Sequence, residues 1–374
     1  SDADDVVATF NHIVKDDSGI MTRRNVSWMK STEKLAQSQK FGLKFTVNDN
    51  PWIPMDNIYL HPDFGYIRVE GLANDLPGTI GFLNSEMNGF VPTPEEFKVA
   101  QGKFSQSMMH GGKDKAKDLF DALVDSTLYG STVKENDKAL TYESLVKFAR
   151  VYFTPENRLV SVVSPKSEEM VSKLLLAGAK SPAKTYPLTD KSYLKLDTPV
   201  YVDVPGGGER TYLFWGFVKN IDRGDEAALK ALGLILSDKI IFDVREKQGL
   251  AYRMTATSAV RDDKALFYIS LGTRPQNAEV LLPQFESLMS RQTLGELSEE
   301  DVQKTINMYL GRMMFRRLSS INQAYYLGTS LFFENEMNHD KAFLDALKAV
   351  TLEDVNRVAD KYLSAENAIS IVVR

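Results

Sequence analysis

The chain of 374 residues contains the same module twice. Near the end of each copy, six residues recur in the same order and with the same spacing. They are Thr141, Glu143, Ala149, Tyr152, Glu156 and Asn157 in the first copy, and Thr351, Glu353, Ala359, Tyr362, Glu366 and Asn367 in the second. The offset is constant (351 − 141 = 210), and each set leads into an apolar run. Such a duplication predicts two homologous domains with the same order of elements.

The two copies are not equivalent. A second match, Gly42-Leu43 with Gly249-Leu250, keeps nearly the same offset (249 − 42 = 207), but two nearby positions differ in chemistry. These are Ser38, which stands opposite Arg245, and Phe45, which stands opposite Tyr252. The second copy also begins with two predicted strands that the first copy lacks. Missing strands would leave a sheet edge unpaired, so we expect the chain to be a fragment or mature product of a longer protein.

Apolar periodicity predicts similar elements in both copies. Strands are expected at 41–47, 66–69 and 159–163 in the first copy and at 200–204, 211–217, 252–258 and 266–271 in the second, with a last strand at 369–373. Helices are expected at 4–14, 22–39, 77–88, 114–128 and 142–152, with helical runs at the matching places of the second copy. Two helix starts carry capping boxes, Thr93 with Glu96 and Ser298 with Asp301.

This order predicts an α+β fold of two homologous domains, each a mostly antiparallel sheet with helices packed on one face. The expected boundaries are a first domain at 1–164, a linker at 165–196 and a second domain at 197–374. The linker holds one amphipathic helix, 168–176, followed by glycine, prolines and several lysines, a composition typical of connections between domains.

The run Arg245-Glu-Lys-Gln-Gly-Leu-Ala-Tyr252 joins a predicted helix to a predicted strand. Gly249 stands at the junction, where a helix end commonly needs a left-handed residue. Arg245 would lie in the last helical turn and Tyr252 at the start of the strand, so that a guanidinium and a phenol can meet at one corner. Both groups donate to peptide carbonyls. The alternative is structural, an arginine favoured by the helix C-terminus and a half-buried strand tyrosine.

Composition excludes several classes of function. The net charge is −5 with no block of like charge, so nothing indicates a nucleic-acid or anionic-membrane surface. The chain has no cysteine, and thus no disulfide, thiolate metal site or cysteine nucleophile. No apolar run approaches the roughly 18 residues of a membrane span. The compartment stays open, with the bacterial periplasm or another part of the cell envelope as one candidate.

The Arg-Glu-Lys-Gln-Gly-Leu-Ala-Tyr corner, together with the Leu-Thr-x-Glu helices that lead into Glu-Asn and a strand, resembles the insulinase/pitrilysin family of zinc metallopeptidases. The resemblance covers nearly the whole chain and is most specific over 200–374. It implies a module of two homologous α/β domains, two of which close around a chamber that holds peptides. In the active module of this family, an inverted zinc motif, His-x-x-Glu-His, lies on the first helix of the first domain.

That motif is absent from this chain. Its four histidines are His12, His61, His110 and His339, and no two lie within five residues of each other. The chemistry needs two imidazoles one helical turn apart with a carboxylate between them. We therefore expect no catalytic residue and no metal ligand in this module, and zinc only in a partner half.

The resemblance implies that the chain is the non-catalytic, C-terminal-type half. Its expected partners are a zinc-bearing peptidase half, in the same polypeptide or in a separate chain, and a peptide substrate. Arg245 and Tyr252 would bind the substrate backbone beside the scissile bond, and the module alone would not hydrolyse peptides. The alternatives are a structural core-type subunit and a peptide-binding scaffold without a proteolytic role.

Overall fold

The structure is a computed structural model. It describes residues 44–47, 67–87, 91–99, 101–102, 115–130, 141–152, 154, 158–176, 192–206, 208–251 and 253–374. Its contacts divide the chain into two compact units. The first unit takes residues 1–111, 134–189 and 315–339, and the second takes 112–133, 190–314 and 340–374. Each unit is described below by itself.

The second unit is built on a five-stranded sheet with the order β3-β7-β4-β6-β5. Its strands are β3 (Val200–Val204), β4 (Thr211–Asn220), β5 (Arg253–Arg261), β6 (Lys264–Thr273) and β7 (Ile369–Val373). All neighbours are antiparallel except β3 and β7, which are parallel. The sheet is therefore mostly antiparallel, as the sequence predicted.

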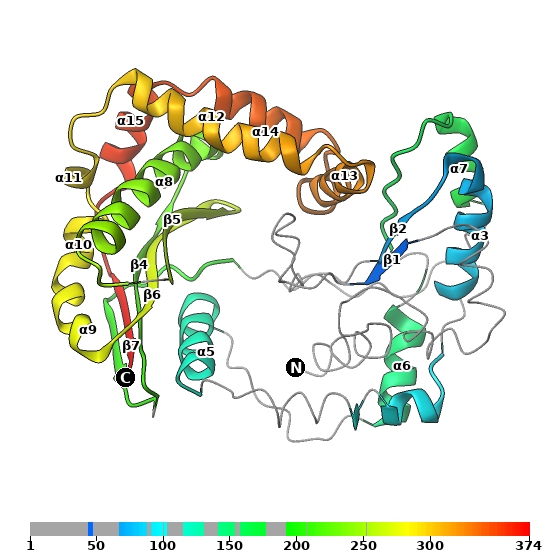
Figure 1. The fold of residues 1–374 in the computed structure, drawn as a ribbon, viewed down its shortest axis with the longest axis horizontal. Coiled ribbons are helices and arrows are strands. Elements are labelled where there is room, and N and C mark those ends of the chain that lie inside the picture. The colour runs from blue at the N-terminus through cyan, green and yellow to red at the C-terminus, as the bar shows by residue number, and fades with distance from the viewer. Residues whose placement is uncertain are drawn as a thin grey trace. The chain divides into compact units, whose positions relative to one another are not determined.

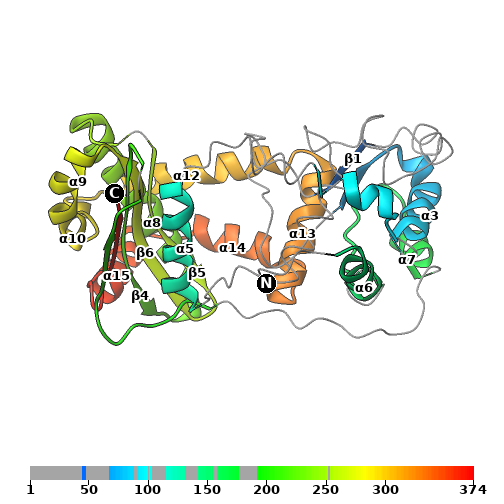
Figure 2. The ribbon, with the colours of Figure 1, turned by 90° about the horizontal axis from the view of Figure 1, so that it is seen from below.

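One face of this sheet carries a layer of helices (Figures 1 and 2). The layer consists of α8 (Glu226–Ile241), α9 (Pro275–Leu281), α10 (Phe285–Leu288), α11 (Arg291–Leu294), α12 (Glu299–Arg316), α14 (His339–Lys348) and α15 (Leu352–Tyr362). Alternate residues of β4, Leu213, Trp215 and Phe217, pack with α8 and α15 in the main core. Burial of these large side chains is the chief source of stability for the unit.

The opposite face of the sheet is covered by α5 (Lys115–Tyr129), which comes from the first copy of the module (Figure 1). Tyr212 and Phe214, the other alternate residues of β4, pack there with Phe120 of α5 and Ile371 of β7. The rings of Phe120 and Tyr212 lie 5.6 Å apart. A helix of one copy therefore completes the hydrophobic core beside the sheet of the other copy.

The first unit shows the reverse exchange. Its described strands, β1 (Lys44–Val47) and β2 (Ile67–Glu70), pair antiparallel. Its helices are α3 (Leu76–Met87), α6 (Tyr142–Tyr152), α7 (Glu168–Leu176) and, from the second copy, α13 (Ser320–Glu334). α13 contacts β2, and a Cβ atom added at Gly328 would lie 3.2 Å from the Ser161 side chain.

The internal duplication is visible in the element bounds. α5 and α13 are related by one offset at both ends (320 − 115 = 205 and 334 − 129 = 205), and so are α6 and α15 (352 − 142 = 210 and 362 − 152 = 210). Both predicted capping boxes are formed, with the Glu96 amide 3.3 Å from Thr93 Oγ1 and the Asp301 amide 3.2 Å from Ser298 Oγ. The two capping boxes are also 205 residues apart (298 − 93 = 205). α5 of the first copy belongs to the second unit, and α13 of the second copy belongs to the first unit.

The predicted fold class, α+β with mostly antiparallel sheets and helices on one face, is confirmed, and α5 is an addition on the second face. The strand predicted at 159–163 is wrong, since those residues form no strand and pair with no described strand. Its counterpart β7 is a strand because β3 and β4 flank it. The helices predicted at 4–14 and 22–39 lie outside the described residues, and the boundary at 165–196 stays a prediction.

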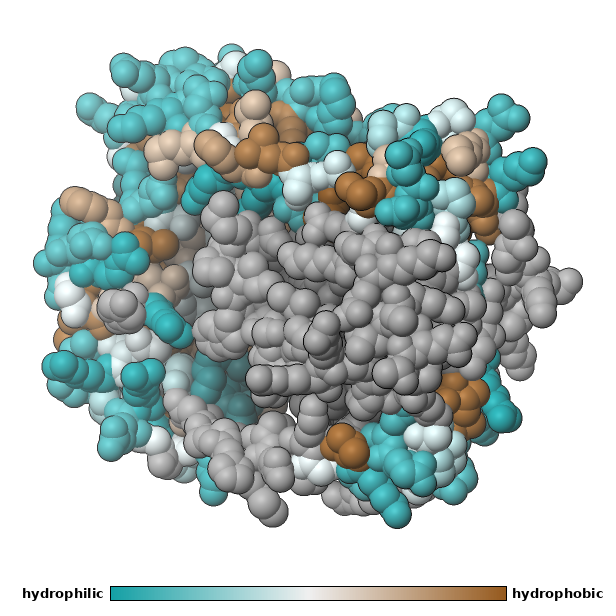
Figure 3. All heavy atoms as spheres, turned by 45° about the vertical axis from the view of Figure 1, so that its right-hand side comes forward, coloured by the Kyte–Doolittle hydropathy of each residue, from teal (hydrophilic) through white to brown (hydrophobic). Residues whose placement is uncertain are grey.

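Two features of the surface bear on function. No helix in the described part of the chain is long and apolar enough to cross a membrane. On the face shown in Figure 3, described side chains are mostly hydrophilic, and the hydrophobic ones lie in small separate groups.

A buried carboxylate ties the start of α8 to α15. Asp225 is 5% exposed and accepts hydrogen bonds from Lys361 Nζ at 3.0 Å and from the Tyr362 hydroxyl at 2.7 Å, as well as from Arg357. Burial alone would raise the pKa of Asp225. The hydrogen bonds from Arg357, Tyr362 and Lys361 outweigh burial, so that its pKa lies below the usual value.

We expect Asp225→Asn to lower the free energy of unfolding at pH 7 by about 1–3 kcal/mol, because it leaves charged donors poorly paired. Since the folded-state pKa is depressed, Asp225 stabilises the protein above about pH 4, and this contribution is lost as pH falls through the folded-state pKa. Urea denaturation should therefore show that the free energy of unfolding falls less between pH 7 and pH 3 in the variant than in the unchanged protein. The control is Asp360→Asn on α15, which removes an exposed ion-pair partner of Arg291. It should change the free energy of unfolding by less than about 0.5 kcal/mol. Equal effects of the two variants would contradict the assignment.

Packing of α5 on the sheet predicts a second stability effect. Phe120 is 3% exposed and Leu119 is 38% exposed. Phe120→Ala should lower the free energy of unfolding by about 3–5 kcal/mol because it leaves a cavity beside Tyr212. Leu119→Ala should cost less than about 1 kcal/mol. A small loss in Phe120→Ala would show that α5 is not needed by the second unit.

Candidate functional site

The predicted corner begins where α8 changes its winding. α8 ends at Ile241 and continues as a π-helical turn, Phe242–Lys247, in which the Gln248 amide bonds to the Asp243 carbonyl at 3.1 Å. Gly249 follows with φ +64°, the left-handed residue that the sequence predicted. β5 then starts at Arg253. Short π-helical turns are frequent at functional sites, which independently marks this segment.

The loop after Gly249 is held by the end of β6 and the start of α9. The Leu250 carbonyl accepts hydrogen bonds from the Thr273 hydroxyl and from Asn277 Nδ2, the latter at 3.0 Å. Thr273 is buried, and Gln248 Nε2 bonds to Asp243 and to Gln284. These contacts fix the backbone that leads into Tyr252, as a site needs if its side chains are to be held for binding.

Arg245 lies in the π-helical turn beside Val244, which is fully buried. The Arg245 side chain is 46% exposed, and its Nε donates to Glu246 Oε1 at 2.7 Å. Its two terminal nitrogens bond to no residue that the structure describes, which leaves the fork of the guanidinium open to a peptide carbonyl or carboxylate. Tyr252 lies outside the described residues, so the meeting of Arg245 and Tyr252 stays a prediction.

The residues of this chain do not fit a catalytic zinc ion. The His-x-x-Glu-His pattern is absent from the whole sequence, and the described residues contain no group of three histidine, cysteine or acidic side chains that could hold a metal. His339 opens α14, while the other three histidines lie outside the described residues. No hydrolytic step can be assigned to the described side chains.

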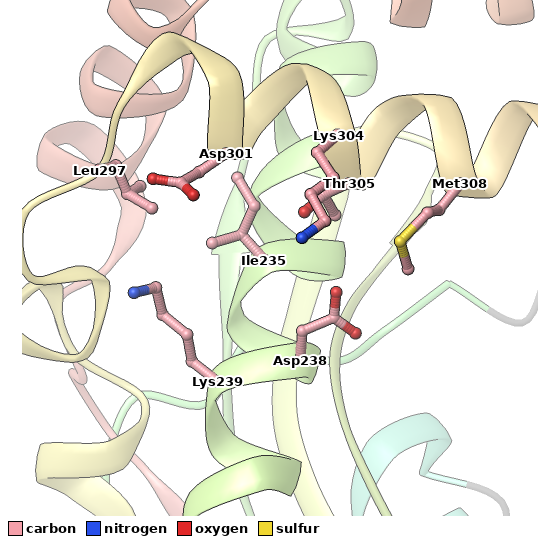
Figure 4. Close-up of a pocket in the computed structure, with 8 residues that line it drawn as sticks. All are labelled: Ile235, Asp238, Lys239, Leu297, Asp301, Lys304, Thr305 and Met308. Carbon is pink, nitrogen blue, oxygen red and sulfur yellow. The ribbon is translucent and has the colours of Figure 1, made fainter.

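A pocket of about 330 Å³ lies between α8 and α12 (Figure 4). It is lined by Ile235, Asp238, Lys239, Leu297, Asp301, Lys304, Thr305 and Met308. Asp301 is already engaged by Ser298 at the start of α12. Burial raises the pKa of Asp238, and the charge of Arg312 opposes that rise. With two acids and two lysines, the pocket has no excess charge.

Sequence reasoning found Arg245 and Gly249 but missed the residues that support them. The π-helical turn leaves the apolar spacing of the helix unchanged at Ile240 and Val244, so periodicity gives no sign of it. Thr273 and Asn277 are 23 and 27 residues away from Leu250 in sequence and reach it only through the pairing of β5 with β6. A prediction of that hairpin with its register would have been needed to find them.

Fold and site together define a duplicated α/β module with a half-exposed arginine at its helix-to-strand corner, and its described residues contain no group that could hold a metal ion. Residues 139–309 match the family model described as the peptidase M16 inactive domain. The predicted resemblance is confirmed, because this match and the relatives named as zinc proteases fit a non-catalytic, insulinase-like module. The match is also consistent with a module that holds no cofactor itself.

Similar proteins agree with this assignment. An uncharacterized zinc protease of Streptomyces coelicolor is 21% identical over 337 residues, which cover 82% of this chain and 71% of that protein. A protease from Helicobacter pylori has a TM-score of 0.74 at 16% identity, covering 99% of this chain and 89% of that one. The periplasmic protease PqqL from Escherichia coli has a TM-score of 0.67 at 15% identity, and the match covers 91% of this chain but only 38% of PqqL. The two structural likenesses show the fold.

The left-handed conformation of Gly249 predicts the effect of adding a side chain. Gly249→Ala should lower the free energy of unfolding by about 1 kcal/mol, because alanine is strained at positive φ. Gly311→Ala is the matched control, since Gly311 lies inside α12 with open space around it. It should raise stability by about 0.5–1 kcal/mol through helix propensity. Equal shifts in the two denaturation curves would contradict the corner geometry.

Proposed function

We propose that this chain is the substrate-binding half of a two-part zinc metallopeptidase. It closes a peptide chamber over a separate zinc-bearing half and does not hydrolyse peptides alone. The observation that carries the proposal is the corner itself, in a chain without a zinc motif. Arg245 is half-exposed in the π-helical turn, its terminal nitrogens bond to no described residue, and the loop that follows is braced by Thr273 and Asn277.

The chemistry that Arg245 and Tyr252 would supply is hydrogen bonding to the peptide. A peptide carbonyl develops negative charge while water attacks it, and fixed donors favour that charge. Holding the substrate in an extended conformation lowers the entropic part of the activation barrier in the catalytic half. Glu246 partly neutralises Arg245, which suits a neutral backbone carbonyl better than a full counter-charge.

The partner half can be in the same polypeptide or in a separate chain. The similar proteins support both arrangements, because the match covers most of the Helicobacter pylori protease but less than half of PqqL. The cell envelope is proposed as the compartment, in line with the word periplasmic in the description of PqqL.

Peptide binding tests the proposal directly. A ten-residue unstructured neutral peptide with an uncharged fluorophore should bind the whole chain, as measured by fluorescence anisotropy. Arg245→Ala should weaken binding about tenfold, since a charge-assisted hydrogen bond is lost, and Tyr252→Phe by a smaller factor. Lys348→Ala, an exposed charge at the end of α14, should have no effect.

Hydrolysis separates the chamber role from a scaffold role. The chain alone should not cleave the peptide. A chain bearing His-x-x-Glu-His should cleave it when the two are mixed or fused, and Arg245→Ala should then lower kcat/KM. Unchanged turnover with Arg245→Ala and Tyr252→Phe, or no peptide binding at all, would leave a structural subunit as the better description.

A further inference from the structure

Three arginines lie on adjacent strands at the end of the sheet in the second unit. Arg210 directly precedes β4, Arg274 directly follows β6, and Arg253 opens β5. β4, β6 and β5 are neighbours in this order. We call these three residues the arginine row.

Strand register brings the row together. Thr211 pairs with Thr273, so Arg210 and Arg274 stand at the next opposed position, and Arg253 pairs with Gly272, two residues before Arg274. Arg274 keeps extended backbone angles (φ −77°, ψ 149°), so the alternation continues to it. Adjacent strands lie about 4.8 Å apart and two residues span about 7 Å along a strand, so the row extends over about 12 Å from Arg210 to Arg253.

The alternation of the strands, continued by one residue at Arg210 and Arg274, places all three arginines on one face of the sheet. Residues of even number in β4 and β6, such as Tyr212 and Leu266, pack in the cluster beside α5, and the register places Arg253 on the same face as Gly272. Gly272 has no side chain, and a Cβ atom there would lie 3.0 Å from the Tyr212 ring. The row thus lies beside Gly272 and Tyr212, whose ring is buried and also has Lys117 Nζ over it at 5.9 Å.

The charges of the row are uncompensated in the part of the chain that the structure describes. All three arginines are exposed, and none forms a hydrogen bond or ion pair through its side chain. Glu209, the residue before Arg210, forms no ion pair either. By contrast Arg374, at the end of β7 on the other face, is paired with Asp203 and Glu279. Like charges on adjacent strands repel one another, and an anionic ligand would relieve that repulsion.

We propose that the arginine row binds an acidic segment of an extended peptide substrate, so that the module prefers substrates with carboxylates beside the segment held at the corner. This inference rests on the proposed function. Arg253 directly follows Tyr252 in the sequence, so the row begins one residue after the corner. Two carboxylates two residues apart point to the same side of an extended peptide and are about 7 Å apart, a separation that suits neighbouring arginines of the row.

The test compares two ten-residue peptides with an uncharged fluorophore, one with Glu at positions i and i+2 and one with Gln at both. The whole chain should bind the Glu peptide at least about fivefold more tightly in 50 mM salt, with the preference falling as salt rises. Arg253→Gln/Arg274→Gln should abolish the preference while binding of the Gln peptide stays unchanged. Arg210→Gln should reduce it in part.

The control Lys341→Gln/Lys348→Gln removes the same charge from exposed positions on α14 and should keep the preference. Equal affinity for the two peptides would overturn this inference and leave the proposed function standing. Loss of the preference in the α14 control would also overturn it, because net charge would then explain the result. Failure of both peptides to bind would overturn this inference and the proposed function together.

Discussion

A strand that is apolar on both of its faces dictates the architecture of the second unit. From Thr211 to Val218, every residue of β4 is buried. Leu213 and Phe217 are covered by the helix layer, whereas Tyr212 and Phe214 need cover on the opposite face. Sheets that carry helices on one face only commonly leave alternate residues polar, and β4 does not. The second copy of the module does not itself cover this face in the structure, and α5 of the first copy does so.

The same constraint explains which parts of the fold could be predicted from sequence. The bounds of α6, α7, β3 and β7 follow from local periodicity and capping, and the structure reproduces them. The exchange of α5 and α13 could not be predicted in this way, because it depends on which sheet face lacks cover rather than on either helix. The unbroken apolar run in β4 was the available sign, since it is inconsistent with helices on a single face. The mistaken strand at 159–163 has the same origin, because an apolar run becomes a strand only where neighbours can pair with it.

The key residues of the corner could be predicted from the sequence, whereas the residues that hold its backbone in place could not. Glycine at the end of a helix pattern predicted the left-handed turn at Gly249, and the structure has it. Arg245 was singled out as a donor, and its terminal nitrogens bond to none of the residues that the structure describes. The π-helical turn, and the hydrogen bonds from Thr273 and Asn277 to Leu250, come from long-range packing. A family resemblance indicates which residues to propose for binding. The rigidity of the backbone around them depends on long-range contacts that only the structure shows.

The reciprocal exchange of helices has a consequence for how the chain can be divided. A cut in the predicted linker would produce two fragments. The first would retain α5, which packs on the sheet of the second, and the second would retain α13, which contacts β2 of the first. The second fragment would leave Tyr212 uncovered, and the first would expose Phe120. The fragments should therefore stay associated after proteolytic nicking and aggregate if expressed apart. In this topology, duplication has produced two interlocked repeats rather than two separable ones.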